Sequence, residues 1–126
     1  MRQVIRAESA PRAVGPYSQA IVAAGCVWVS GQIALDPATG SLVGPDVEAE
    51  VRQCLRNVGA ILAAAGSGLE RVIRATVYLT DLEDFERINR VWAEHFEREA
   101  PARACVQVCR LPRGARVEVE VVALVS

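Results

Sequence analysis

Apolar residues recur along the chain at two spacings, and these spacings predict its strands and helices. Alternation of apolar and polar residues with a period of two is typical of a strand that is buried on one face. Strands are expected on this basis at residues 3–6, 18–24, 26–32, 72–80, 102–109 and 117–125. Gly25 separates the second strand from the third, which predicts a hairpin.

Two further segments have the three- and four-residue spacing of a helix. The first begins after Asp46, whose side chain can cap a helix, and runs to about Ala65, where Gly66 supplies a C-terminal stop. The second begins near Asp84 and ends before Pro101, because proline disfavours the continuation of a helix. Each segment has one apolar stripe: Val47, Val51, Leu55, Val58 and Leu62 in the first, and Phe85, Ile88, Trp92 and Phe96 in the second.

The last third of the chain predicts a β-hairpin, made of strands 102–109 and 117–125 around a turn at 111–116. Alternation places Arg103, Cys105 and Gln107 on one face of the first strand. It places Glu118 and Glu120 on one face of the second. We expect these two polar sets to share a face, opposite the apolar positions Ala104, Val106, Val108, Val117, Val119, Val121 and Ala123.

These elements predict an α+β fold, with a mixed sheet of about six strands and two helices on one face. The uncovered face is expected to carry Arg103 and Glu118 among apolar groups, and a small monomer would expose it to water. Sheets of this kind are usually buried against copies of themselves. We therefore expect a homo-oligomer with clefts between its subunits.

Length and charge narrow the functional classes. A chain of 126 residues fits one domain, and its formal charge of −1 disfavours a nucleic acid or an anionic membrane as partner. All 14 basic residues are arginine, so the chain has no lysine for Schiff-base chemistry, pyridoxal phosphate or a P-loop. Guanidinium groups are left as the main cations for anion recognition.

The cysteines indicate a reducing compartment and no metal centre. No apolar segment typical of a signal peptide opens the chain, and no apolar run reaches the roughly 18–20 residues of a membrane span. We therefore expect a cytoplasmic protein whose thiols, Cys26, Cys54, Cys105 and Cys109, are reduced. On one strand Cys105 and Cys109 would lie about 13 Å apart, too far to share a zinc ion. His95 is the single histidine, so no metal site is expected.

Six strings of residues, in order along nearly the whole chain, resemble the RidA/YjgF family. They are Val14-Gly15-Pro16-Tyr17-Ser18-Gln19-Ala20, Ser30-Gly31-Gln32-Ile33, Asn57 with Ala64-Ala65-Gly66, Asp84-Phe85 with Asn89, Pro101-Ala102-Arg103-Ala104-Cys105-Val106, and Leu111-Pro112 with Val117-Glu118-Val119-Glu120. The resemblance covers residues 1–126 as a single RidA-like domain. It implies a chorismate-mutase-like β-α-β fold, assembled as a homotrimer with three ligand clefts between subunits.

The resemblance also implies an activity. Family members include 2-iminobutanoate/2-iminopropanoate deaminases, which hydrolyse enamine and imine intermediates released by pyridoxal-phosphate enzymes to 2-oxo acids and ammonia. Such hydrolysis needs no cofactor, and the ligands are small 2-imino and 2-oxo acids. Other members are described as endoribonucleases, translation inhibitors or chaperone-like proteins.

Three residues are expected to carry the chemistry. Arg103 matches the family's carboxylate-binding arginine, and a guanidinium can hold a carboxylate by two parallel hydrogen bonds. The alternative for Arg103 is an ion pair with Glu118 or Glu120 across the hairpin. Glu118 matches the acidic residue that orients the attacking water, with Glu120 as the alternative. Cys105 matches a position that lines the site, where it either holds the water through its carbonyl or only packs.

Four further residues are expected to bind substrate: Tyr17, Ser30, Gly31 and Asn89. Tyr17 follows a rigid Gly-Pro turn, and the small Ser30 and Gly31 allow a ligand to approach the backbone at a strand end. Asn89 lies beside the apolar stripe of the second helix. The ordinary alternatives are a half-buried tyrosine, a simple turn and a solvent-facing asparagine. A nucleophilic Cys–His pair would need His95, which is expected at the edge of the Trp92 stripe.

Three functional hypotheses follow. Imine deamination accounts for Arg103 and Glu118 together. A non-catalytic binder or sensor of small carboxylates would use the same cleft without turnover. Cleavage of RNA would need a basic groove with stacked aromatic side chains, whereas the chain has only two tryptophans, two tyrosines and two phenylalanines.

Overall fold

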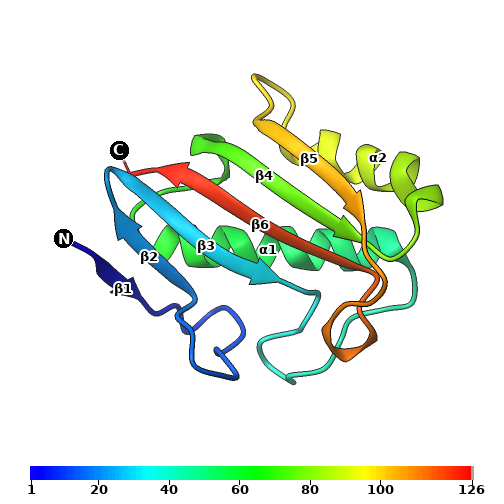
Figure 1. Ribbon diagram of the computed structural model, residues 1–126, viewed down its shortest axis with the longest axis horizontal. Coiled ribbons are helices and arrows are strands. Elements are labelled where there is room, and N and C mark those ends of the chain that lie inside the picture. Colours follow the sequence, from blue (N-terminus) through cyan, green and yellow to red (C-terminus); the bar gives the residue numbers. More distant parts are fainter. Residues whose placement is uncertain (126) are drawn as a thin grey trace.

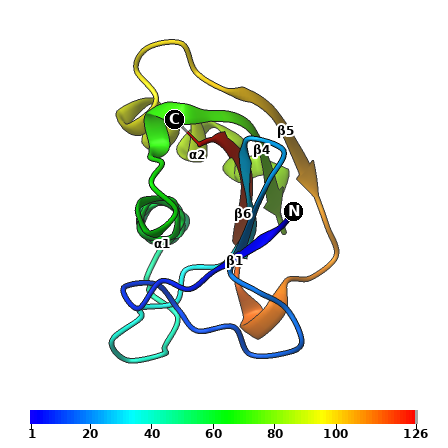
Figure 2. The same cartoon turned by 90° about the vertical axis from the view of Figure 1, so that its left-hand side faces the viewer.

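Two helices cover one face of a six-stranded sheet in the computed structural model, which describes residues 1–125 (Figure 1, Figure 2). The helices are α1 (Val47–Ala64) and α2 (Phe85–His95). Short 3₁₀ turns lie at Leu69–Arg71, Leu82–Asp84 and Pro112–Gly114. The strands are β1 (Gln3–Ile5), β2 (Ala20–Ala23), β3 (Cys26–Gln32), β4 (Val72–Leu79), β5 (Ala102–Gln107) and β6 (Val117–Leu124). The α+β class and all eight elements expected from the sequence are confirmed.

The order of the strands in the sheet is β1-β2-β3-β6-β4-β5. β6 pairs antiparallel with both β3 and β4, whereas β5 pairs parallel with β4 at the edge of the sheet. The expected hairpin of residues 102–109 with 117–125 is therefore wrong. The reason is α2, which connects β4 to β5 and lets β5 return in the same direction as β4, so that β6 enters the sheet on the far side of β4.

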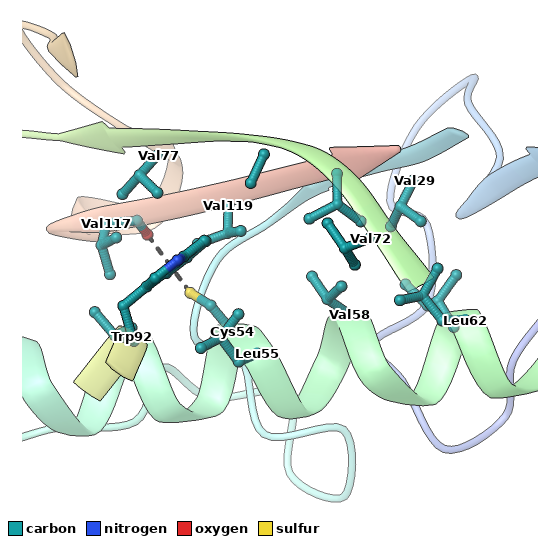
Figure 3. Packing of buried hydrophobic residues seen from close by; sticks show 14 of the residues in the cluster. Val29, Cys54, Leu55, Val58, Leu62, Val72, Val77, Trp92, Val117 and Val119 are labelled. Carbon is teal, nitrogen blue, oxygen red and sulfur yellow. Dashed lines mark hydrogen bonds between the residues drawn. The ribbon is translucent and has the colours of Figure 1, made fainter. Parts of the chain in front are cut away.

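The core lies between the sheet and the helices. The Asp46 side chain accepts a hydrogen bond from the backbone N–H of Ala49 at 2.9 Å, which caps α1 as expected. The apolar stripe of α1 then packs on β3 and β6. Figure 3 shows Trp92 of α2 among the side chains of Val77, Val119 and Cys54. α2 is thereby fixed against the end of the sheet that carries β5.

The uncovered face of the sheet exposes several large apolar side chains. Val4, Trp28, Val106 and Leu124 are all at least 38 % exposed there, and Trp28 reaches 49 %. Exposed apolar side chains on a sheet face are typical of a protein interface. Within residues 1–125, no helix is long and apolar enough to cross a membrane.

A buried asparagine on α1 supports the loop that follows β3. Asn57, only 1 % exposed, donates from Nδ2 to the backbone carbonyls of Leu35 (2.9 Å) and Ile33 (3.3 Å). Its Oδ1 accepts a hydrogen bond from Gln53 Nε2 at 2.9 Å. The loop therefore keeps its shape through main-chain contacts to a helix.

Replacing Asn57 with alanine leaves these buried carbonyls without a donor. We expect Asn57→Ala to lower the free energy of unfolding by about 1–3 kcal/mol, as measured by urea denaturation. Arg90→Ala, at an exposed position of α2, serves as the control and should change it by less than about 0.5 kcal/mol. Equal denaturation midpoints for the two variants would contradict the role given to Asn57.

Candidate active site

A pocket of about 470 Å³ lies where β3 ends and β6 begins. Four of the seven residues predicted for the site line it: Tyr17, Ser30, Gly31 and Glu118. The remaining lining residues are Pro11, Arg12, Val14, Gln19, Gln32, Ile33, Leu35, Pro112 and Arg113. The pocket thus gathers three segments that are far apart in sequence.

Gly31 makes room for the carboxylate of Glu118. The β3–β6 register shifts between Val29 and Gln32, so β3 is irregular at this point. A Cβ atom added to Gly31 would lie only 1.9 Å from Glu118 Oε2. The glycine was predicted from sequence to permit a close approach to the backbone. In the structure, the group that lies close to the Gly31 backbone is the Glu118 side chain.

The environment of Glu118 favours its protonated form. Burial raises the pKa of this carboxyl above its usual 4.5, and the neighbouring Glu120 carboxylate raises it further. Glu120 itself accepts a hydrogen bond from the hydroxyl of Tyr78. A raised pKa makes this carboxyl a better proton acceptor than an exposed glutamate, which suits general acid–base chemistry.

The other walls of the pocket are held by main-chain contacts. Ser30 donates from Oγ to the Ser18 carbonyl at 2.6 Å, and the Tyr17 hydroxyl accepts from the Val14 N–H at 3.3 Å. Tyr17 remains 49 % exposed. Gln19, which is buried, donates from Nε2 to the Pro11 and Ala7 carbonyls. Gln19 therefore fixes the loop that forms one side of the pocket.

Arg103 lies on the helix-covered face of the sheet, so the expectation that it lies on the uncovered face is wrong. It is aligned with Ala75 of β4, whose side chain is fully buried under the helices. Glu118 is aligned with Tyr78, which belongs to the opposite set of β4 residues. Arg103 and Glu118 of one subunit therefore point to opposite faces, and no ion pair joins them.

The Arg103 guanidinium is held by α2. Its Nη2 donates to Asn89 Oδ1 at 2.8 Å. Its Cζ lies 5.1 Å from the centre of the Trp92 ring and 5.6 Å from that of Phe85. Among residues 1–125 no carboxylate neutralises it. The alternative of an ion pair between Arg103 and Glu118 or Glu120 is therefore excluded within the chain. Asn89 is not a solvent-facing residue without a partner, because it accepts the hydrogen bond from Arg103.

Cys105 is half-buried on the same face as Arg103. Burial raises the pKa of its thiol, although the Arg103 charge opposes this effect. The thiol is therefore protonated at neutral pH and unsuited to act as a nucleophile.

His95 contacts the Val91 carbonyl through Nδ1 at 3.0 Å, as expected for a residue at the edge of the apolar stripe. No cluster of metal-ligating side chains occurs in the described part of the chain.

The predicted site is thus divided into two groups. Arg103, Asn89 and Cys105 form one group beneath α2. Tyr17, Ser30, Gly31 and Glu118 belong to the pocket at the start of β6. The structure of the single chain does not bring the two groups together.

Sequence reasoning missed a buried ion pair that anchors the start of β6. Glu50, only 1 % exposed, accepts the backbone N–H of Arg116 at 3.0 Å and pairs with its guanidinium at 3.1 Å. Burial nonetheless raises the pKa of Glu50. The signal was present in the sequence, since Glu50 lies three residues after Val47 on the apolar stripe. Arg12 and Arg113, which line the pocket, were also not selected from the sequence.

Comparisons with known proteins identify the family. The profile of the family described as Endoribonuclease L-PSP matches residues 7–125. The chain belongs to this family, which is the RidA/YjgF family.

The relatives carry several functional names. A RutC family protein of Pyrococcus horikoshii is 48 % identical over 98 % of each chain. The human 2-iminobutanoate/2-iminopropanoate deaminase is 44 % identical, over 98 % of this chain and 90 % of its own. The crystal structure of E. coli TdcF with bound serine has a TM-score of 0.92 at 42 % identity, over 98 % of this chain and 99 % of TdcF. An imine deaminase role is thus present in the family under which this chain falls.

The raised pKa of Glu118 predicts a pH-dependent cost to stability. Between pH 4.5 and the raised value the folded chain binds more protons than the unfolded chain, so stability falls as the pH rises through this window. We expect Glu118→Gln to raise the thermal midpoint at pH 8 by a few degrees, and to leave it unchanged below pH 4.5.

Glu70→Gln removes one negative charge at an exposed position outside the pocket and is the control. Thermal melts of the three proteins between pH 4 and 8 provide the measurement. A Glu118→Gln midpoint below that of the wild type at pH 8 would show that the ionised carboxylate stabilises the fold.

Proposed function

We propose that this protein is a cofactor-independent deaminase of 2-imino acids such as 2-iminobutanoate and 2-iminopropanoate. The observation that carries the proposal is the Arg103 guanidinium. It is half-buried between two aromatic rings, oriented by Asn89, and unpaired with any carboxylate in residues 1–125. A cation prepared in this way suits a small ligand that brings its own carboxylate.

In the proposed reaction Arg103 holds the substrate carboxylate and Glu118 holds a water molecule. The water oxygen adds to the imine carbon while Glu118 accepts a proton from it. The same carboxyl returns the proton to nitrogen, which gives a neutral carbinolamine. Glu118 then transfers the proton of the carbinolamine hydroxyl to nitrogen, the C–N bond breaks as the carbonyl forms, and ammonia leaves the 2-oxo acid. Because the imine carbon is already electrophilic, positioning and a modest proton transfer supply the catalysis.

We infer that the two groups of the site meet between subunits of a homotrimer. The pocket of one subunit would receive the Arg103 group of its neighbour. Two observations support this assembly: the opposite faces of Arg103 and Glu118 in the sheet, and the exposed apolar residues of the uncovered face. The four free cysteines fit an oligomer that works in the cytoplasm.

The relatives support the choice of substrate. Four mammalian proteins at 44–45 % identity are named 2-iminobutanoate/2-iminopropanoate deaminase. The bound molecule in TdcF, serine, is a small amino acid with a carboxylate. The family description also names an endoribonuclease, but within residues 1–125 the aromatic pair of Trp92 and Phe96 is buried in the core and offers no surface for stacked bases.

Loss of the Arg103 guanidinium should abolish most of the activity. Threonine dehydratase supplies 2-aminocrotonate, which becomes 2-iminobutanoate, and semicarbazide traps the imine that is not hydrolysed. We expect Arg103→Ala to reduce kcat/KM at least about a hundredfold, since two charge-assisted hydrogen bonds contribute about 1.5 kcal/mol or more each. Arg103→Lys should recover only part of it, because lysine cannot bind in the bidentate mode.

Arg90→Ala removes an exposed arginine from the same helix that holds Asn89 and is the matched control. Its rate should equal that of the wild type. If the wild type does not accelerate 2-oxobutanoate release, while 2-oxobutanoate still raises its thermal midpoint, the protein is a carboxylate binder and not an enzyme.

A mixing experiment tests the site between subunits. Arg103→Ala and Glu118→Gln are each expected to be inactive, but their mixed oligomers contain some interfaces with both native residues. Random mixing in a trimer should restore about a quarter of the wild-type activity. Each variant unfolded and refolded alone is the control. No recovery in oligomers shown by mass spectrometry to be mixed would place both residues of a site in one subunit.

A further inference from the structure

Two guanidinium groups line the pocket in addition to the groups of the proposed reaction. Arg12 approaches it from the loop before β2, and Arg113 from the 3₁₀ turn before β6. The pocket also contains one carboxylate, that of Glu118, whose pKa is raised by burial. The lining of the pocket therefore has an excess of positive charge.

Arg12 stands on a fixed segment of backbone. The residue before it, Pro11, accepts a hydrogen bond from Gln19 Nε2 at 2.7 Å. The same amide binds the Ala7 carbonyl at 3.1 Å, and Gln19 Oε1 accepts the Ala7 N–H at 2.7 Å. The buried glutamine thus determines where the backbone of Arg12 lies, while the side chain of Arg12 stays exposed.

Arg113 is also held at the pocket. Its φ of 62° lies in the left-handed region, which an arginine adopts only when its surroundings impose it. Its Nη2 donates to the Gly40 carbonyl at 3.2 Å. This contact with a neutral acceptor restrains the guanidinium without removing its charge.

Neither arginine is paired with an acidic side chain in the described residues. The ion pairs of residues 1–125 use other arginines: Arg52 with Glu94, Arg87 with Asp84, and Arg116 with Glu50. Arg116, a near neighbour of Arg113 in sequence, is fully engaged with Glu50 and the Pro45 carbonyl. Arg12 and Arg113 thus belong to the arginines without an ion pair in the described residues, and both line the pocket.

We propose that the pocket selects 2-imino acids whose side chain ends in a second carboxylate, such as 2-iminosuccinate and 2-iminoglutarate. This inference rests on the proposed deaminase function. The partner subunit binds the carboxylate beside the imine carbon in that function, so Arg12 and Arg113 remain to bind the distal one. A pocket of about 470 Å³ has room for a ligand of four or five carbons.

The reaction is the same hydrolysis with a longer substrate. Water adds to the imine carbon, the C–N bond breaks, and the products are ammonia and a 2-oxo dicarboxylate. The distal carboxylate takes no part in the bond changes. Arg12 and Arg113 therefore determine specificity, and their loss should change the preference between substrates more than the chemistry itself.

The test compares three imines made in place by amino-acid oxidases in the presence of catalase. Aspartate, glutamate and 2-aminobutanoate give 2-iminosuccinate, 2-iminoglutarate and 2-iminobutanoate, and semicarbazide traps what is not hydrolysed. We expect the wild type to hydrolyse at least one dicarboxylate about tenfold faster than 2-iminobutanoate, since a charge-assisted hydrogen bond is worth about a factor of ten or more. The preference should shrink in 0.5 M NaCl, because salt screens exposed charges.

The double variant Arg12→Gln/Arg113→Gln should remove this preference, through a loss on the dicarboxylates about tenfold larger than the loss on 2-iminobutanoate. Arg71→Gln/Arg98→Gln removes two exposed charges from residues that do not line the pocket, and should leave all three rates unchanged. A wild type that prefers 2-iminobutanoate, or a double variant that lowers all rates equally, overturns the inference.

A binding measurement separates this outcome from failure of the proposed function. Oxaloacetate or 2-oxoglutarate should raise the thermal midpoint of the wild type more than 2-oxobutanoate does, and the double variant should lose this difference. If the protein hydrolyses 2-iminobutanoate but does not prefer dicarboxylates, the proposed specificity is wrong and the deaminase proposal stands. If no imine is hydrolysed, the deaminase proposal fails, and the thermal shifts still decide whether the pocket binds dicarboxylates.

Discussion

The parallel pairing of β5 with β4 determines on which face of the sheet Arg103 and Glu118 lie. Because α2 connects these two strands, Arg103 returns to the sheet beneath the helix that supplies Asn89 and the Trp92 ring. The same connection leaves β6 between β3 and β4, where Glu118 faces the other way. The position of Arg103 under α2 and that of Glu118 on the open face thus both follow from the way α2 connects β4 to β5.

The local part of this structure could be predicted from the sequence, and the non-local part could not. Spacing of apolar residues identified both helices and all six strands, and alternation correctly grouped Arg103 with Cys105 and Glu118 with Glu120. Alternation relates residues within a strand, however, and does not say which strand is the neighbour. The assumed pairing of β5 with β6 therefore put Arg103 on the wrong face.

Burial of Glu118 joins the fold to the proposed chemistry. Gly31 allows β3 to pass close to the carboxylate, and the removal of water that follows raises its pKa. An ionised carboxylate in such a place weakens the fold, whereas a carboxyl with a raised pKa suits the proton transfers of the proposed imine hydrolysis. The ion pair of Glu50 with Arg116 anchors the start of the strand that carries Glu118.

Gln19 shapes its loop entirely through main-chain atoms of Ala7 and Pro11. The path of the backbone is then insensitive to which side chains the intervening positions carry. Residue 12 can change its charge or size while the wall of the pocket stays in place. Under the proposed specificity, substitutions at residue 12 can therefore change the substrate preference with little effect on the stability of the fold.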